Sequence, residues 1–217
     1  MNCADLNVLN ANTNLAYETI TSFSEIPIVN KTLVICDIDD TLIKSKKDLE
    51  HFISVVKSDY NLIKIEYPFF EDSKEPTFKE LLSEAWDMQQ IHNQVFGFEH
   101  TDNDGFNKMT ELVAQTNSKI IFLTARHKLS EEFTRKNFNQ IGLDYENYQV
   151  YYTDNAKIKG QYIHDHIDTS EYEYVVFIDD NIFQITSVAC LGPKFKCYLF
   201  EIPNHAKYST LLNKLKN

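Results

Sequence analysis

The chain has 217 residues, of which 43% are hydrophobic and 13% aromatic, and its 21 Lys and Arg against 32 Asp and Glu give a formal net charge of −11. The length and the apolar content exclude a disordered chain and allow one sizeable α/β domain with a small appendage. The negative charge disfavours nucleic acid as a partner of the bulk surface, whereas a local cation and a lysine would still admit a small phosphorylated substrate.

The N-terminal sequence, MNCADLNVLN, contains neither a basic n-region nor an apolar h-region, so no Sec-type signal peptide is predicted. No stretch approaches the ~20 apolar residues that a membrane span needs. We therefore expect a cytoplasmic or otherwise soluble protein, with secretion by a signal-independent route left open. The oligomeric state is left open too, as is the question of whether the chain is a fragment of a longer protein. The four cysteines lack CxxC spacing, which indicates reduced thiols and no zinc site.

Strands and helices are expected to alternate along the chain. Runs rich in Val, Ile, Phe and Tyr predict strands at 32–36, 119–124, 148–152 and 174–178, with a fifth at 195–200. These runs do not alternate with polar residues, which indicates a parallel sheet covered on both faces. Apolar stripes predict helices at 47–58, 77–94, 106–116 and 130–141; in the second, Thr77 and Glu80 stand at capping-box spacing. The alternation predicts an α/β fold, a doubly wound, Rossmann-like and mostly parallel sheet with helices on both faces.

The interval between the first two predicted strands is far longer than one crossover helix requires. Residues 44–105 are therefore predicted to be an inserted helical subdomain, and residues 1–43 and 106–217 the α/β core. The segment 100–111, HTDNDGFNKMTE, has the acidic spacing of a calcium loop. His100 stands at its first ligand position, however, so we expect a polar loop that leads into a helix.

Polar residues end three of the predicted strands, and two lysines lie between the third and fourth strands. The strand ends and the interval between the third and fourth strands contribute Asp37, Asp39, Asp40, Thr124, Ala125, Arg126, Lys157, Lys159, Asp179 and Asp180. The carboxyl ends of parallel strands meet at one edge of a sheet, where ligands bind. Several carboxylates in one cleft need a neutralising cation, and oxygen ligands favour Mg²⁺. A carboxylate beside Mg²⁺ and a lysine can attack phosphorus and form an aspartyl-phosphate, while a second carboxylate serves as acid and base.

The motif order hhhDxDxT, hhhT, Lys and hhhDD, where h is apolar, resembles the haloacid dehalogenase (HAD) superfamily of phosphohydrolases. The run from ICDIDDTLI through LTARHK to VVFIDDN resembles, within it, the bacterial acid-phosphatase-like family of the DUF2608 type. The resemblance covers roughly residues 30–43 and 106–200, and the insertion matches the position of a C1-type cap.

The resemblance implies a role for each motif residue. Asp37 would be the nucleophile and Asp39 the general acid/base. The implied Mg²⁺ ligands are Asp37, the backbone carbonyl of Asp39, Asp179 and Asp180. The implied phosphate contacts are Thr124, the neighbouring Ala125, and a lysine, for which Lys159 is preferred and Lys157 is the alternative.

The predicted function is Mg²⁺-dependent hydrolysis of phosphomonoesters, on a phosphorylated small molecule or a phosphoprotein. Phosphotyrosine or another aryl phosphate is a candidate substrate because the insertion is rich in aromatic residues. Among these are Tyr67, Phe69, Phe70, Phe78, Trp86, Phe96 and Phe98.

Two other classes of protein share some of these features. In a signalling receiver domain the acidic pair comes early in the chain and the lysine comes last. Here Lys159 precedes Asp179 and Asp180, so a receiver domain is disfavoured. A phosphoryl-binding signalling or scaffold protein of HAD fold without turnover remains the alternative, since intact motifs do not measure activity. Arg126 is open to two interpretations, a substrate contact or a structural ion-pair partner.

Overall fold

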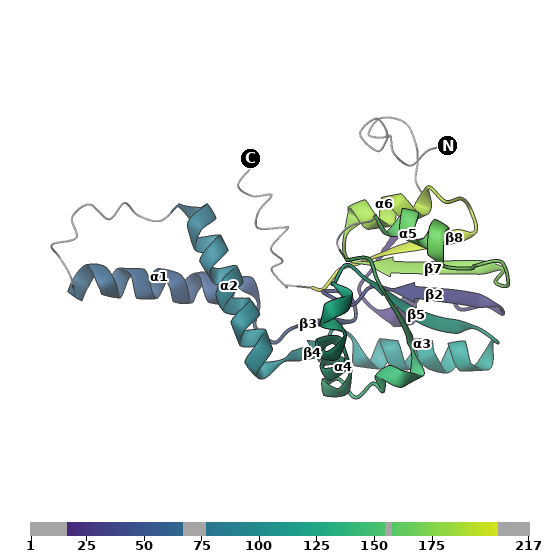
Figure 1. Ribbon diagram of the computed structural model, residues 1–217, viewed down its shortest axis with the longest axis horizontal. Helices are drawn as coiled ribbons and strands as arrows, with labels where there is room; N and C mark the ends of the chain where they lie inside the picture. Colours follow the sequence, from purple (N-terminus) through teal and green to yellow (C-terminus); the bar gives the residue numbers. More distant parts are fainter. Residues whose placement is uncertain (1–16, 67–76, 155–157, 204–217) are drawn as a thin grey trace. The chain divides into compact units, whose positions relative to one another are not determined.

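The computed structural model describes residues 17–66, 77–154 and 158–203, without the side chains of residues 60–66. Lys157 and the aromatic residues at 67, 69 and 70 lie outside the described residues. The described chain forms two compact units, one of residues 17–44 and 100–203 and the other of residues 45–66 and 77–99. Figure 1 shows the elements of both units.

The first unit is built on a six-stranded sheet with the strand order β1-β8-β7-β2-β5-β6, in which every neighbouring pair is parallel. The strands are β1 (Tyr17–Ile20), β2 (Thr32–Cys36), β5 (Lys119–Thr124), β6 (Gln149–Tyr152), β7 (Tyr174–Asp179) and β8 (Phe195–Phe200). The five predicted strands are confirmed. Prediction misses β1 because this edge strand is only four residues long and three of them are exposed.

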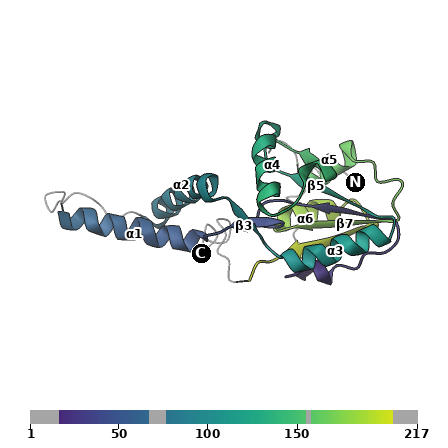
Figure 2. The same ribbon diagram turned by 90° about the horizontal axis from the view of Figure 1, so that it is seen from below.

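Helices cover both faces of this sheet (Figures 1 and 2). On one face lie α3 (Asn103–Gln115) and α4 (Glu131–Gln140), where the Phe122 ring of β5 is 6.4 Å from that of Phe106 and 4.9 Å from that of Phe138. On the other face lie α5 (Lys159–His166) and α6 (Ile182–Ala189), whose Ile163 and Ile185 join the buried core of β2, β5 and β7. Short 3-10 turns are η2 (Phe23–Glu25), η3 (Lys128–Ser130) and η4 (Tyr145–Asn147).

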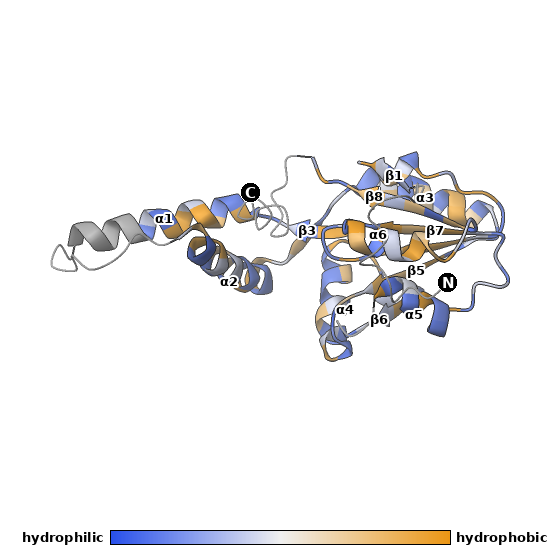
Figure 3. Ribbon diagram, turned by 90° about the horizontal axis from the view of Figure 1, so that it is seen from above, coloured by the Kyte–Doolittle hydropathy of each residue, from blue (hydrophilic) through white to orange (hydrophobic). Residues whose placement is uncertain are grey.

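The predicted doubly wound α/β fold is thereby confirmed. All five residues of β2 are buried because the strand lies between β5 and β7 under helices on both faces. In Figure 3, β5 and β7 are coloured as hydrophobic, while the helices carry both colours. Prediction missed α5 and α6, which are only eight residues long and so offer little periodicity.

The second unit pairs two helices, α1 (Leu49–Glu66) and α2 (Phe78–Phe96). The predicted capping box opens α2: Thr77 accepts from the Glu80 N–H, and Glu80 accepts from the Thr77 N–H. The helices share an apolar core of Leu49, Phe52, Ile53, Val56, Leu81, Leu82 and Ala85. The chain passes between the units at a two-stranded sheet of β3 (Ile43–Ser45) and β4 (Phe98–His100). Within the described ranges no helix combines the length and the apolar content needed to cross a membrane.

Most of the segment 100–111 belongs to α3, which begins at Asn103, so the expected polar loop is confined to the residues just before it. Asp102 caps this helix by accepting from the Gly105 N–H at 3.0 Å. Its other carboxylate oxygen accepts from the Ser22 hydroxyl at 2.7 Å and the Phe23 N–H at 2.9 Å. The carboxylate therefore ties α3 to η2. A Cβ at Gly105 would lie 1.9 Å from Asp102 Oδ2, so a larger residue there would displace this carboxylate.

Candidate active site

Asp37 extends β2 by one residue beyond its last regular position. Its N–H donates to the carbonyl of Ile178 in β7 at 2.9 Å, and its side chain is buried. The chain then turns sharply: the N–H groups of Leu42 and Ile43 both donate to the Ile38 carbonyl at 2.9 Å. Asp40 adopts a φ of 56° within this turn, a left-handed conformation that aspartate tolerates better than most residues. The turn thus leaves Asp37 at the carboxyl edge of the sheet.

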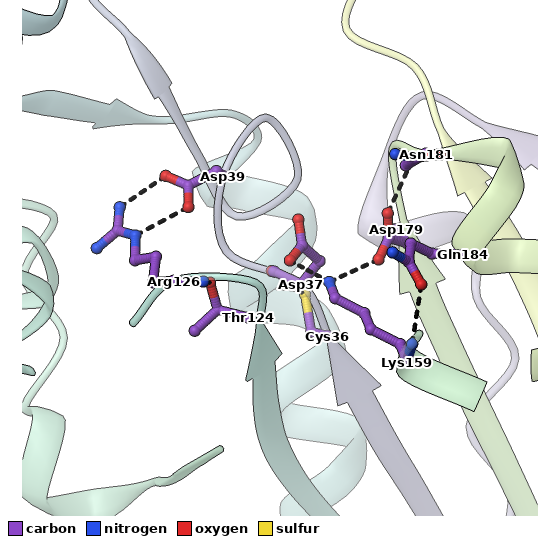
Figure 4. Close-up of polar contacts among 9 residues, drawn as sticks. All are labelled: Cys36, Asp37, Asp39, Thr124, Arg126, Lys159, Asp179, Asn181 and Gln184. Atoms are coloured by element: carbon purple, nitrogen blue, oxygen red, sulfur yellow. Dashed lines mark hydrogen bonds and ion pairs between the residues drawn. The ribbon is translucent and has the colours of Figure 1, made fainter. Parts of the chain in front are cut away.

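Lys159, the first residue of α5, joins two carboxylates at this edge (Figure 4). Its side chain is only 3% exposed, and its Nζ donates to Asp37 and to Asp179 Oδ2, the latter at 2.7 Å. The backbone N–H of Lys159 donates to Gln184 of α6 at 2.9 Å, and the other oxygen of Asp179 accepts from the Asn181 N–H at 2.8 Å. Each group of this buried cluster is therefore held by more than one element.

Gly160 allows α5 to approach α6 closely enough to place Lys159. A Cβ at this position would lie 2.4 Å from the carbonyl oxygen of Ser187 and 2.7 Å from its carbonyl carbon. The N–H of Gly160 donates to the Ser187 hydroxyl at 3.1 Å. Any side chain here would collide with backbone, so the glycine is a steric requirement of the contact.

In the buried cluster the Lys159 ammonium stays charged, whereas the pKa values of the two carboxyl groups are raised. Burial raises the pKa of Asp37 and of Asp179 to about 6, although Lys159 opposes the rise in both. Burial alone would lower the pKa of Lys159, but Asp179 and Asp37 outweigh it and raise that pKa. Removing carboxylates from water without full neutralisation is unfavourable, which gives the site an attraction for a further cation.

Three carboxylates of the site have the geometry of a metal site. Ligand oxygens of Asp37, Asp179 and Asp180 all lie within 4.8 Å of one another. Three carboxylates against the one ammonium of Lys159 leave two negative charges, which matches a divalent cation. The donors are all hard oxygens, so the set fits Mg²⁺ rather than a thiolate- or imidazole-seeking metal.

Asp39 points its side chain away from this cluster, toward Arg126 (Figure 4). Arg126 Nε donates to Asp39 Oδ2 at 2.8 Å and Nη2 donates to Oδ1 at 2.6 Å, which makes a bidentate ion pair. Nη1 of the same guanidinium donates to Thr134 at 3.0 Å and to Asn137 at 2.9 Å. Burial alone would lower the pKa of Arg126, but Asp39 raises it, so the guanidinium stays charged.

Thr124, at the end of β5, is fully buried, and its hydroxyl oxygen accepts from the Arg126 N–H at 3.2 Å. Half-buried Ala125 lies between them in the chain. Thr124 and Asp37 end neighbouring parallel strands, because β2 pairs with β5 up to the Cys36–Phe122 position.

Four of the predicted site residues meet in one cluster, namely Asp37, Lys159, Asp179 and Asp180. The predicted metal ligand from Asp39 is its backbone carbonyl, and this stays a prediction, as do the phosphate contacts of Thr124 and Ala125. Sequence reasoning missed Gln184 as a support of Lys159 and the two anchors of Arg126. The sequence does contain a sign of these anchors. Thr134 and Asn137 are polar residues three positions apart, so they lie on one face of α4.

The sheet is parallel, β2 and β7 end in acidic residues at its carboxyl edge, and a lysine lies between these residues. These features define an α/β protein of HAD-like fold. Residues 12–159 match the family described as "Protein of unknown function (DUF2608)". The chain belongs to this family, as its motifs predicted.

The chain is also similar to several solved structures, each at low sequence identity. The HAD domain of effector protein Lem4 from Legionella pneumophila, an inactive mutant, is 13% identical with a TM-score of 0.45, over 86% of this chain and 93% of that one. A conserved haloacid dehalogenase-like protein of unknown function from Agrobacterium tumefaciens is 13% identical with a TM-score of 0.46, over 82% and 88%. The Legionella pneumophila effector Ceg4 is 12% identical with a TM-score of 0.44, over 88% and 96%. The comparison with curated proteins gives no match.

Proposed function

We propose that this protein is a Mg²⁺-dependent phosphatase that hydrolyses phosphomonoesters through an aspartyl-phosphate on Asp37. The observation that supports the proposal most is the buried group of Asp37, Lys159 and Asp179, with Asp180 beside it, at the carboxyl edge of β2 and β7. This group combines a nucleophile, a fixed positive charge and a set of oxygen ligands for a divalent cation.

In the first half-reaction a carboxylate oxygen of Asp37 attacks phosphorus, and the bond from phosphorus to the ester oxygen breaks. Protonated Asp39 gives its proton to that oxygen, and the alcohol leaves. In the second, Asp39 takes a proton from water as the water oxygen attacks phosphorus. The bond from phosphorus to Asp37 breaks, which releases inorganic phosphate and restores both side chains to their starting states.

Lys159 supports both half-reactions because its ammonium orients Asp37 and offsets the charge that gathers on the phosphoryl oxygens. Its burial strengthens this effect, since few waters screen the charge. Mg²⁺, held by Asp37, Asp179 and Asp180, would supply Lewis-acid stabilisation of the same oxygens.

The direct test is phosphate release from p-nitrophenyl phosphate with Mg²⁺ and then with EDTA, for the wild type and Asp37→Asn. We expect turnover that EDTA abolishes and that Asp37→Asn lacks. Asp168→Asn is the matched control, because Asp168 is exposed and caps a turn by accepting from the Ser170 N–H, which asparagine can also do. Near-full activity in Asp37→Asn would remove Asp37 as the nucleophile.

Asp39→Asn should slow turnover by roughly 10²–10⁴, the usual worth of a positioned acid/base. Two outcomes separate the proposal from its alternative. Turnover on any ester of a broad phosphoester panel supports a phosphatase. Binding of Mg²⁺ and inorganic phosphate, measured by calorimetry, with no turnover on the whole panel would indicate a phosphoryl-binding protein of the same fold.

The substrate class that we propose is an aryl phosphate, including phosphotyrosine, on a small molecule or a protein. The support is the aromatic content of the inserted segment, in which Trp86 is 39% and Phe96 59% exposed on α2, while Phe52 is buried in the helix-pair core. Exposed aromatic rings offer stacking surface to a flat leaving group. A kcat/KM for sugar phosphates far above that for a phosphotyrosine peptide would overturn this assignment alone.

A further inference from the structure

The two side chains of the ion pair between Arg126 and Asp39 differ in their exposure to solvent. The Arg126 side chain is 11% exposed, whereas that of Asp39 is 47% exposed. A half-exposed aspartate on its own would exchange among its rotamers, since each is solvated about equally well. Here both of its oxygens accept from one guanidinium, at 2.8 and 2.6 Å. The fork geometry of arginine therefore selects one orientation of the Asp39 carboxylate.

The guanidinium is itself fixed from the side opposite Asp39. Nη1 donates to Thr134 and to Asn137, which are 0% and 1% exposed on α4. The hydroxyl of Thr134 donates its own proton to the Ser130 carbonyl at 3.1 Å, so its oxygen is left as an acceptor for Arg126. The Phe133 ring lies 5.5 Å from the guanidinium carbon. Arg126 is thus a preorganised group whose position depends on α4 and not on Asp39 alone.

We infer that Arg126 is the positioning residue for Asp39, and that its fork fixes the direction in which this half-exposed carboxylate points. The inference rests on the proposed phosphatase function. Asp39 can keep one hydrogen bond to Arg126 while its other oxygen gives a proton to the leaving group or takes one from water. Orientation of such a group contributes to the rate because the proton transfer needs a defined geometry.

The other interpretation of Arg126, direct contact with the substrate phosphate, is less well supported by the same contacts. Four of the five guanidinium N–H groups are already committed, two to Asp39 and two to α4. A bidentate contact to phosphate would have to displace one of these partners, because it needs two N–H groups. Lys159 already provides a buried cation beside Asp37.

The experiment compares two esters whose need for a proton differs. An alkyl phosphate has a poor leaving group that needs protonation, whereas p-nitrophenolate leaves with little proton assistance. Arg126→Gln should lower kcat/KM on the alkyl ester by about 10–10²-fold, as expected for a misplaced catalytic group. It should lower kcat/KM on p-nitrophenyl phosphate by less than about 3-fold, because kcat/KM reports only the steps up to loss of the leaving group, and this loss depends little on the acid. The inhibition constant of inorganic phosphate should not change.

Three further variants make the comparison specific. Arg126→Lys keeps the charge but not the fork, so it should behave like Arg126→Gln. Thr134→Val removes one anchor and keeps Arg126, so it should show the same ester preference with a smaller loss; it also serves if Arg126 variants fold poorly. Arg135→Gln is the control, because Arg135 is another arginine next to α4 residue Thr134 but pairs with Glu132 and Glu146 instead.

In an Asp39→Asn background, Arg126→Gln should add no further loss on the alkyl ester, since the group that it positions is gone. Equal losses on both esters with a weaker phosphate inhibition would overturn the inference in favour of a phosphate contact. A lower melting temperature with both esters affected equally would overturn it in favour of a purely structural ion pair. A wild type inactive on every ester would overturn the proposed function, and this inference with it.

Discussion

Gly160→Ala is the substitution for which the structure makes the sharpest prediction. A Cβ at this position would lie 2.4 Å from the carbonyl oxygen of Ser187, whereas an ordinary carbon–oxygen contact is about 3.3 Å. One of the two helices must therefore move by about 0.9 Å. Because the obstacle is backbone, no side-chain rotation relieves it.

The expected cost follows from overpacking at a buried helix contact, about 1–3 kcal/mol. Alanine recovers part of this, since it is favoured over glycine in helices by roughly 0.5–1 kcal/mol. A net loss of about 1–2 kcal/mol corresponds to a fall in melting temperature of about 2–8 °C for a protein of this size. Lys159 is the adjacent residue and should move with α5, so the proposed phosphatase activity should fall by up to about 10²-fold.

Thermal unfolding by circular dichroism and phosphate release from p-nitrophenyl phosphate measure the two effects. Gln161→Ala is the matched control, because this residue is exposed on the same turn of α5, and its melting temperature should stay nearly unchanged. Adding Ser187→Ala to Gly160→Ala should not rescue stability, since the collision is with the Ser187 carbonyl. A Gly160→Ala protein as stable and active as the Gln161→Ala control would refute the proposed steric role.

Three other predictions concern stability and reactivity. Thr77→Ala should cost about 1 kcal/mol of unfolding free energy, measured by urea unfolding, because it removes the capping box of α2; no loss would show that this cap is dispensable. Burial lowers the pKa of His100 to about 4, although Asp102 opposes the shift, so between pH 6.5 and 4 the unfolded state binds the extra proton. Stability should therefore fall with decreasing pH over this window by up to about 3 kcal/mol, and a His100→Gln variant with an unchanged pH slope would contradict this. Burial raises the pKa of the Cys36 thiol, so iodoacetamide should modify half-buried Cys190 in the native protein well before it modifies Cys36. Peptide mass spectrometry measures both rates, and equal rates would contradict the buried position of Cys36.

Most of the sheet could be predicted because its inner strands are short apolar runs whose signal is local. β2, β5, β7 and β8 were all found from composition, and the start of α2 was found from a capping box. β1 could not be predicted, because it has only four residues and three of them are exposed, which leaves no hydrophobic pattern to recognise. Its place comes from pairing with β8, which is distant in the chain.

The amino-acid sequence by itself determined which chemical groups reach the carboxyl edge, since Asp37, Thr124 and Asp179 each stand where a buried strand stops. Only the tertiary structure decided how those groups are partnered. Lys159 faces two carboxylates because Gly160 lets α5 rest against the Ser187 backbone, and Asp39 turns to Arg126 because buried polar groups of α4 hold the guanidinium. Such partnerships depend on the packing of helices far apart in the chain, and local sequence patterns do not record distances of that kind.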